Sequence, residues 1–204
     1  QQDVCEYLEK SLGKARDVEV ESGRYGIWDD VCLPDLRAAT HVDRLFGFVR
    51  EERLQCRGCR GDVRVVCERD VVLRVRPKHL DGGPMTVSEM YLDACGPVVV
   101  QGEEALMCND CGCRTAHDQQ SRMLTTPNVL VVQVKRNPEG VEAPQSGRAS
   151  GGVARDLVGA GRLLRGPVAV EERLTLSDGC DMDLIGVVYH NGETIKSGHY
   201  TCLC

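Results

Sequence analysis

Two short cysteine motifs constrain the fold of this chain more than any other feature of its sequence. Each has the pattern Cys-x-x-Cys, and they span Cys56–Cys59 and Cys108–Cys111. Four thiolates on two tight turns suit a tetrahedral zinc ion at a closed structural site. The 48 residues between the motifs, 60–107, exceed the spacing of a compact zinc ribbon. The sequence therefore predicts that long hairpin strands and a helix bring the two turns together.

The remaining cysteines leave alternatives open. The chain has 12 cysteines in 204 residues. One alternative is therefore that the two motifs arise by chance and share no metal ion. Cys113 follows the second motif closely and is a competing ligand. Cys67 and Cys95 stand singly within apolar segments and are expected in the core. Cys5 lies in the first turn of a predicted helix, where the dipole can acidify a thiol, but we interpret it as an ordinary helix residue.

Composition excludes several classes of protein. Hydrophobic residues at 42% and charged residues at 27% are ordinary for a soluble globular chain. No apolar run approaches the ~20 residues of a membrane helix, so no membrane partner is expected. A net charge of −6 argues against nucleic-acid binding. Many cysteines in a chain with a large aliphatic content favour a reduced, intracellular protein of the cytoplasm or nucleus over a disulfide scaffold.

Hydrophobic periodicity predicts an α+β arrangement. A capping box at Asp3 and Glu6 begins a helix over about 3–16, and a second box at Thr86 begins a helix that Gly96-Pro97 ends. Residues 17–43 are predicted to be mainly loop. The predicted strands cover 45–56, 62–67, 71–76, 120–125, 128–136, 168–176, 183–190 and 197–204, with a glycine-rich, mobile insertion over 137–166.

The last two strands form a predicted hairpin that carries the second chemical signal. Asn191-Gly192 is the expected turn, and Gly198-His199-Tyr200 follows it. A histidine next to glycine can serve as a general base where another backbone passes closely. A purely structural histidine is the alternative, and His190 is a competing candidate nine residues earlier. The other histidines are expected on the surface or in loops: His41, His79 and His117.

The two ends of the sequence suggest a fragment. The chain begins with Gln1 directly before a helix and ends at Cys204 within a strand pattern. Natural domains rarely begin at a helix cap and stop inside a strand. We therefore expect a domain that is truncated at both ends.

Taken in order, these motifs resemble the ubiquitin-specific proteases, a family of deubiquitinating cysteine proteases. The first eight residues are similar to its glutamine box, QQD-x-x-E-F-L, and Leu45-Phe46-Gly47 is similar to the segment before its first zinc motif. Residues 85–108 resemble its helix before the second motif, and 126–136 resemble its P-x-v-L-x-x-x-L-K-R-F strand. Residues 187–200 resemble its histidine box, H-x-G…G-H-Y.

The resemblance implies a papain-like cysteine protease fold with thumb, palm and zinc-bearing fingers. Residues 1–44 would be part of the thumb, 45–125 mainly the fingers, and 126–204 the palm with its antiparallel sheet. The implied activity is hydrolysis of the peptide or isopeptide bond after the C-terminal glycine of ubiquitin, with ubiquitin and ubiquitinated proteins as partners.

The resemblance also assigns individual residues. His199 matches the catalytic histidine, and Gly198 and Tyr200 belong to the substrate-binding part of its motif. The four motif cysteines match a structural zinc site. The family's nucleophile motif, N-x-G-N-T-C, does not occur in residues 1–204, and the orienting Asp or Asn is expected beyond Cys204. A catalytically inactive ubiquitin-binding module is therefore one alternative, and an unrelated zinc-ribbon scaffold is another.

Overall fold

The structure, a computed structural model, describes residues 4–23, 39–61, 63–77, 84–136, 166–194 and 197–204. Its helices are α1 (Val4–Glu21), α2 (His41–Phe46), α3 (Val87–Cys95) and the 3₁₀ turn η1 (Gly102–Glu104). Its strands are β1 (Phe48–Cys56), β2 (Val63–Asp70), β3 (Leu73–Val75), β4 (Met85–Thr86), β5 (Val98–Val100), β6 (Leu106–Met107), β7 (Arg114–Thr115), β8 (His117–Met123), β9 (Val132–Val134), β10 (Val168–Ala169), β11 (Arg173–Thr175), β12 (Asp181–Asp183), β13 (Val187–Thr194) and β14 (Ser197–Leu203).

The predicted helices form, and one helix was missed. Helix α1 continues past its predicted end to Glu21, where Gly23 adopts a left-handed conformation and its N–H bonds to the Val20 carbonyl. Helix α3 has both hydrogen bonds of the predicted capping box. The short helix α2 covers the end of the segment predicted to be loop, 17–43, and the start of the predicted strand 45–56, which is wrong there because β1 begins at Phe48. Its N-cap is Thr40, whose hydroxyl accepts the Asp43 N–H at 3.1 Å. This helix escaped prediction because six residues are too few for a periodic pattern.

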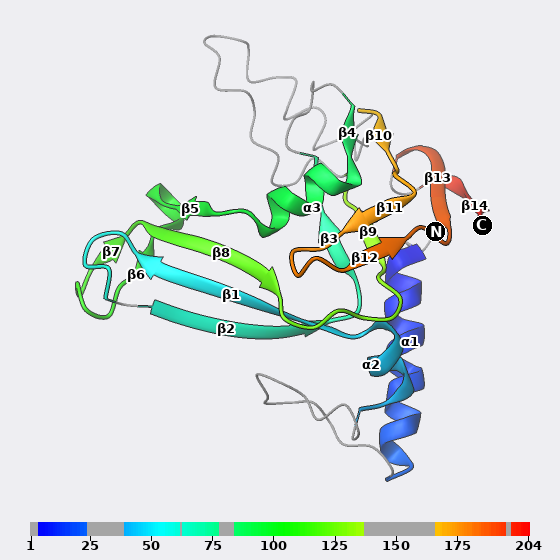
Figure 1. The fold of residues 1–204 in the computed structure, drawn as a ribbon, viewed down its shortest axis with the longest axis horizontal. Coiled ribbons are helices and arrows are strands. Elements are labelled where there is room, and N and C mark those ends of the chain that lie inside the picture. The colour runs from blue at the N-terminus through cyan, green and yellow to red at the C-terminus, as the bar shows by residue number, and fades with distance from the viewer. Residues whose placement is uncertain (1–3, 24–38, 62, 78–83, 137–165, 195–196) are drawn as a thin grey trace.

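A long antiparallel sheet forms one arm of the molecule (Figure 1). Its strand order is β2-β1-β8-β5, and the β1–β2 pairing runs without interruption from Phe48 opposite Asp70 to Gln55 opposite Val63. The small β6–β7 pair lies at the far end of this arm. The predicted combination of helices with an antiparallel sheet is therefore confirmed. The end of the sheet that carries β6 and β7 lies away from the core.

The core lies where the arm meets α3. Tyr91 and Met90 of α3 are fully buried, together with Phe48 at the start of β1. The Tyr91 hydroxyl accepts the Ser177 N–H at 2.9 Å and donates to the Ser177 hydroxyl at 3.1 Å. The cluster is completed by Leu73, Val75, Met123 and Leu176. Side chains from both halves of the chain thus share one core.

The C-terminal half contains several two-stranded pairs. The β11–β12 and β13–β14 pairs are antiparallel, as expected for a palm of antiparallel strands. The β3–β9 and β4–β10 pairs are parallel, which the sequence-based prediction did not include. Each parallel pair joins strands far apart in the chain, so no short turn could have indicated it. Within the described residues, no helix is long and apolar enough to cross a membrane.

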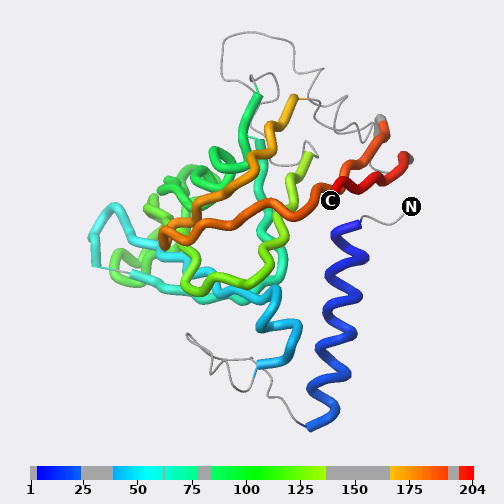
Figure 2. Tube along the Cα trace, turned by 45° about the vertical axis from the view of Figure 1, so that its right-hand side comes forward, coloured from blue at the N-terminus to red at the C-terminus, as the bar shows by residue number. Residues whose placement is uncertain are grey.

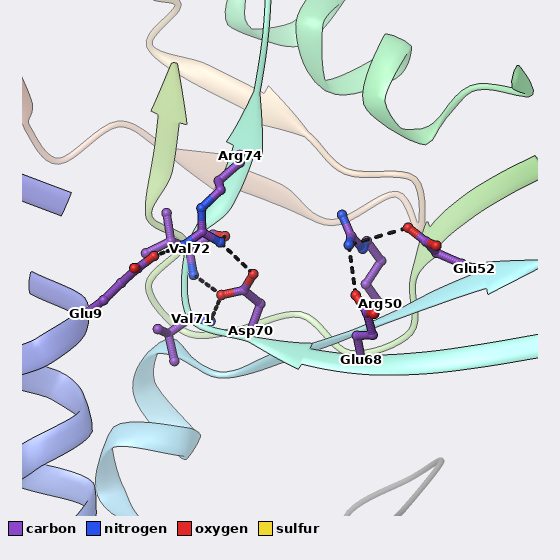
Figure 3. A network of polar contacts seen from close by, with 8 residues as sticks. All are labelled: Glu9, Arg50, Glu52, Glu68, Asp70, Val71, Val72 and Arg74. Atoms are coloured by element: carbon purple, nitrogen blue, oxygen red, sulfur yellow. Dashed lines mark hydrogen bonds and ion pairs between the residues drawn. The ribbon is translucent and has the colours of Figure 1, made fainter. Parts of the chain in front are cut away.

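Charged side chains tie α1 to the body of the protein (Figure 3). Arg74 of β3 forms ion pairs with Glu9 of α1 and with Asp70, the latter at 2.9 Å. A second group lies along the arm, where Arg50 contacts Glu68 at 3.1 Å and Glu52 at 3.4 Å. The Arg74 group fixes the helix beside the strands that pack on α3.

Candidate metal centre and candidate catalytic histidine

Strand pairing brings the two cysteine motifs together at the far end of the arm. Cys56 is the last residue of β1 and lies opposite His117, the first residue of β8. The second motif stands between β6 and β7, just before β8. Arg57 N–H also donates to the Ala116 carbonyl at 2.9 Å, which closes the junction. The long separation of the motifs in sequence is therefore bridged by the β1–β8 register.

The two motifs fold into the same kind of turn. In the first, Arg60 N–H donates to the Cys56 carbonyl at 3.1 Å, and in the second, Gly112 N–H donates to the Cys108 carbonyl at 3.0 Å. Arg60 and Gly112 both have positive φ, at 61° and 64°. The left-handed residue after each second cysteine turns the chain back so that both sulfurs of a motif face the same point.

The four sulfur atoms form a compact group. All lie within 4.8 Å of one another, with Cys56 and Cys111 at 3.9 Å and Cys59 and Cys108 at 3.6 Å. Tetrahedral coordination with Zn–S bonds of about 2.3 Å places sulfurs ~3.8 Å apart. The residues present therefore fit a tetrahedral thiolate site, and this cluster can hold a metal ion.

Hydrogen bonds with a hydroxyl and a backbone N–H reach two of the four sulfurs. The local environment favours the thiolate at Cys56, whereas burial raises the pKa of Cys108. The Thr115 hydroxyl lies 3.1 Å from Cys56 Sγ, and the Cys111 N–H donates to Cys108 Sγ at 3.3 Å. The Thr115 bond is the main cause that lowers the pKa of Cys56 to about 6. The adjoining thiols raise the pKa of Cys111, above all Cys108. A negative charge on Cys56 is therefore accommodated, while four thiolates without a cation would repel one another.

Two predictions about residues near this cluster have different outcomes. The exposed thiol of Cys113 is outside the group of four, and only its carbonyl takes part, accepting the Cys108 N–H at 3.0 Å. His117 was predicted to be a surface or loop residue, and this is wrong because the whole residue is buried. Its Nδ1 lies 2.9 Å from the Thr115 carbonyl. The prediction failed because most residues around His117 in the sequence are polar. They did not indicate that it would lie opposite Cys56 at the end of the β1–β8 pair.

Other cysteines and histidines are only partly as expected. Cys67 and Cys95 are half-buried rather than fully buried, and burial raises the pKa of Cys95. Cys5 is half-buried on α1. His41 has an exposed side chain, as predicted, at 64%.

The predicted histidine hairpin exists, but its turn is elsewhere. Strand β13 runs through Asn191 and Gly192 to Thr194, which pairs with Ser197. The predicted turn at Asn191-Gly192 is therefore wrong. The strand pairing shifts register between Asn191 and Thr194, so this stretch forms a strand irregularity in place of the tight turn.

The hairpin register separates the two candidate histidines. His190 lies opposite Tyr200, and His199 lies opposite Asn191. Residues directly opposite share a face, whereas the next pair along points to the other face. His190 and His199 are therefore near neighbours on opposite faces. On the face of His199, Asn191 Nδ2 donates to Thr201 Oγ1 at 3.0 Å.

Gly198 and Tyr200 lie on the face of His190. A Cβ atom at position 198 would lie 2.4 Å from His190 Nε2, and the rings of His190 and Tyr200 have centroids 4.9 Å apart. His190, the competing candidate, is half-buried within β13. Its contact with Gly198 and Tyr200 was not predicted from the sequence. Gly198 and Tyr200 are two residues apart in one strand and therefore share a face, and a hairpin that pairs His190 with Tyr200 would have indicated the contact.

The hairpin lies beside the first helix. In two views, the C-terminal end of β14 and the N-terminal end of α1 are neighbours (Figures 1 and 2). The motifs at opposite ends of the sequence therefore meet in space. Residues 1–3 of the glutamine-box motif, most of the predicted insertion over 137–166, Cys32 and His79 lie outside the described residues.

Comparison with protein families identifies the chain. A family model described as "Ubiquitin carboxyl-terminal hydrolase" matches residues 1–204. The chain belongs to this family. The match covers the whole chain and bears out the resemblance to ubiquitin-specific proteases. No curated protein sequence matches it.

Solved structures show the same fold. One similar structure is Ubp8 in the SAGA Ubp8/Sgf11/Sus1/Sgf73 DUB module bound to ubiquitin aldehyde, with a TM-score of 0.69 and 20% identity. Another is a module with a Ubp8 variant bound to monoubiquitin, with a TM-score of 0.67 and 19% identity. Each comparison covers 100% of this chain, but only 42% and 40% of the respective Ubp8 chains. The chain thus has the fold of part of the Ubp8 chain and spans less than half of its length.

Proposed function

We propose that this chain is the histidine-bearing and metal-bearing part of a deubiquitinating cysteine protease. Its reaction would be hydrolysis of the peptide or isopeptide bond after the C-terminal glycine of ubiquitin. The observation that carries the proposal is the place of His199, on a hairpin beside the N-terminal end of α1. Ubiquitin and ubiquitinated proteins would be its partners, and the ubiquitin-bound Ubp8 neighbours support this.

In the proposed mechanism, His199 is the general base. It would take the proton from a cysteine thiol, and the thiolate would attack the carbonyl carbon of the scissile bond. His199 would then donate that proton to the leaving amine. We expect the thiol and the Asp or Asn that orients the histidine outside residues 1–204. Gly198 and Tyr200 are proposed to border the ubiquitin tail.

The four-cysteine group is proposed to bind structural zinc through Cys56, Cys59, Cys108 and Cys111. Closed four-cysteine sites supply folding energy and leave no position for a substrate. We assign residues 1–44 to the thumb, 45–125 mainly to the fingers and 126–204 to the palm. The 12 cysteines in a chain with a large aliphatic content support the proposed location in the cytoplasm or nucleus.

The alternative is a ubiquitin-binding module without activity. The upstream sequence of the full-length protein distinguishes the two functions, because the family's N-x-G-N-T-C motif precedes the segment that residues 1–8 resemble. A replaced nucleophile in the full-length protein would support the binding module. For residues 1–204 alone, we expect no labelling by a ubiquitin-based probe that traps reactive cysteines. Labelling of Cys5 or Cys202, abolished by replacement with Ser, would contradict the assigned roles.

The experiment that tests the enzyme function compares His199→Ala with His41→Ala in the full-length protein. His199→Ala should lower turnover of a ubiquitin conjugate by about 10³-fold or more, because base and acid are lost together. His41→Ala removes an exposed side chain and should leave turnover within about twofold. Melting temperatures of both variants exclude misfolding as the cause. Near-normal turnover by a folded His199→Ala protein would refute the assignment.

A further inference from the structure

The imidazole ring of His190 occupies the space that a side chain at position 198 would need. A Cβ atom on Gly198 would lie 2.4 Å from His190 Nε2, 2.7 Å from Cε1 and 2.9 Å from the Asn191 carbonyl oxygen. Real Cβ atoms essentially never lie within 3.0 Å of such neighbours, so the His190 ring and the Asn191 backbone would both have to shift. Glycine at position 198 and histidine at position 190 therefore depend on each other.

Backbone conformation does not explain this glycine. Gly198 is not among the described glycines with positive φ, which are Gly23, Gly102, Gly112 and Gly179. It lies in β14, where any residue can adopt the required extended backbone. On the hairpin itself, the reason for a glycine at position 198 is therefore the space taken by the His190 ring and the Asn191 carbonyl oxygen.

Packing is what the His190 ring contributes to the hairpin. Its Nε2 is buried, and it has no hydrogen-bond partner within the described residues. The ring also lies against Tyr200, tilted by 50° with the two centroids 4.9 Å apart. His190 thereby contacts both neighbours of His199 in the sequence, one on each side. Such packing fixes the strand segment between those two contacts.

We propose that His190 is a positioning residue for His199, and this inference rests on the proposed function. By packing against Gly198 and Tyr200 on one face of β14, the His190 ring holds the backbone that presents His199 on the other face. No hydrogen bond to the His199 ring is found in the part of the chain that the structure describes. The direction of that ring therefore depends on the strand that carries it.

The first test is a double-mutant cycle on thermal unfolding of the full-length protein. Gly198→Ala should lower the melting temperature by roughly 5 °C, because the methyl group overpacks against the ring. In a His190→Ala background the same change should cost less than half as much, the remainder arising from the Asn191 carbonyl. Gly166→Ala is the control, since among the described residues nothing other than its chain neighbours lies within 4 Å of its Cβ position. If Gly198→Ala lowers the melting temperature equally in both backgrounds, the His190 ring does not pack against position 198 and the inference is refuted.

The second test separates positioning from chemistry. His190→Ala should lower kcat by about 10- to 100-fold and leave KM within about twofold, because a displaced base slows only the chemical steps. His190→Phe keeps an aromatic ring without a proton acceptor, and it should retain kcat within about fivefold of the wild type. Equal losses for His190→Ala and His190→Phe, or an unchanged kcat for His190→Ala, would overturn the positioning role.

The two hypotheses fail in different ways. If the wild-type full-length protein does not hydrolyse ubiquitin conjugates, the proposed function fails. The positioning role is then decided by the melting temperatures and by the ¹H–¹³C resonances of the His199 ring. These resonances should shift in His190→Ala and return toward their wild-type positions in His190→Phe. Unshifted resonances in His190→Ala would overturn the inference.

Discussion

The carboxylate of Asp43 lies 2.8 Å from Nη2 of Arg69 and connects α2 to β2. The Asp43 side chain is 1% exposed, and that of Arg69 is 15% exposed. The contact is an ion pair without hydrogen-bond alignment, since Asp43 Oδ1 accepts no hydrogen bond from the described residues. Burial raises the pKa of Asp43, against the hydrogen bonds from Thr40. The arm is thus attached to α2 through a buried carboxylate that depends on a nearby cation.

We expect Arg69→Met to destabilise the protein by about 3 kcal/mol, because it removes the cation that contacts a buried carboxylate. Arg53→Met is the control, since Arg53 is exposed on the same face of the arm, and it should change stability by less than about 0.5 kcal/mol. Urea unfolding measures both values. Adding Asp43→Asn to Arg69→Met should recover part of the loss, and similar losses for the two arginine variants would contradict the prediction.

Metal binding should depend on Cys108 and not on Cys113. Purified, reduced protein is expected to contain about one zinc ion per chain, and Cys108→Ser should remove most of it because three thiolates bind far more weakly. Cys113→Ser removes an exposed thiol outside the group of four and should leave the zinc content unchanged. Elemental analysis of the two variants is the measurement. Folded wild-type protein without zinc would refute the site.

Gly13 lowers the stability of helix α1, and we expect its replacement by alanine to stabilise the protein. It lies inside the helix, without positive φ, and no atom lies within 4 Å of its Cβ position. Gly13→Ala should therefore stabilise the protein by about 0.5–1 kcal/mol. Gly23→Ala should do the opposite, because Gly23 has a φ of 71° at the helix end. Thermal unfolding measures both, and a destabilising Gly13→Ala would show that α1 packs differently.

The stability of the β11–β12 turn should depend on pH through Asp178. The Thr126 hydroxyl donates to Asp178 Oδ2 and lowers the pKa of this carboxyl, helped by the Cys180 N–H, which donates to Oδ1 at 2.9 Å. A folded pKa below the unfolded value means that the unfolded chain takes up the proton first as pH falls. The stabilisation is therefore complete above about pH 4, the ordinary range of Asp, and is lost as pH falls through the folded pKa.

Thr126→Val tests this dependence. The variant should melt below the wild type at pH 6, and the difference should shrink as pH falls below about 4. Thr125→Val is the control, because the Thr125 hydroxyl accepts the Val49 N–H at 2.8 Å and involves no carboxylate. Its effect on the melting temperature should not change over this range. A difference for Thr126→Val that stays constant from pH 6 to 3 would contradict the assignment.

Local patterns predicted much of the fold. The capping box at Thr86 and Glu89 depends on residues three apart, and both of its hydrogen bonds form. The alternation around His199 predicted a hairpin, and the pairing of β13 with β14 bears this out. The order of the motifs indicated the family that the whole chain matches. These features depend on side chains that are close in sequence, so the sequence carries them directly.

Tertiary structure decided how distant segments meet. The number of residues between Cys59 and Cys108 did not predict the strand register. That register places Cys56 opposite His117, and His117 is buried. The Asn191-Gly192 pair favoured a tight turn locally, yet the strand continues past it to pair Thr194 with Ser197. Cross-strand register depends on the sum of many pairings and on what each face buries. By itself, the sequence determined which groups are available to bind metal or move a proton, and the fold decided which of them face one another.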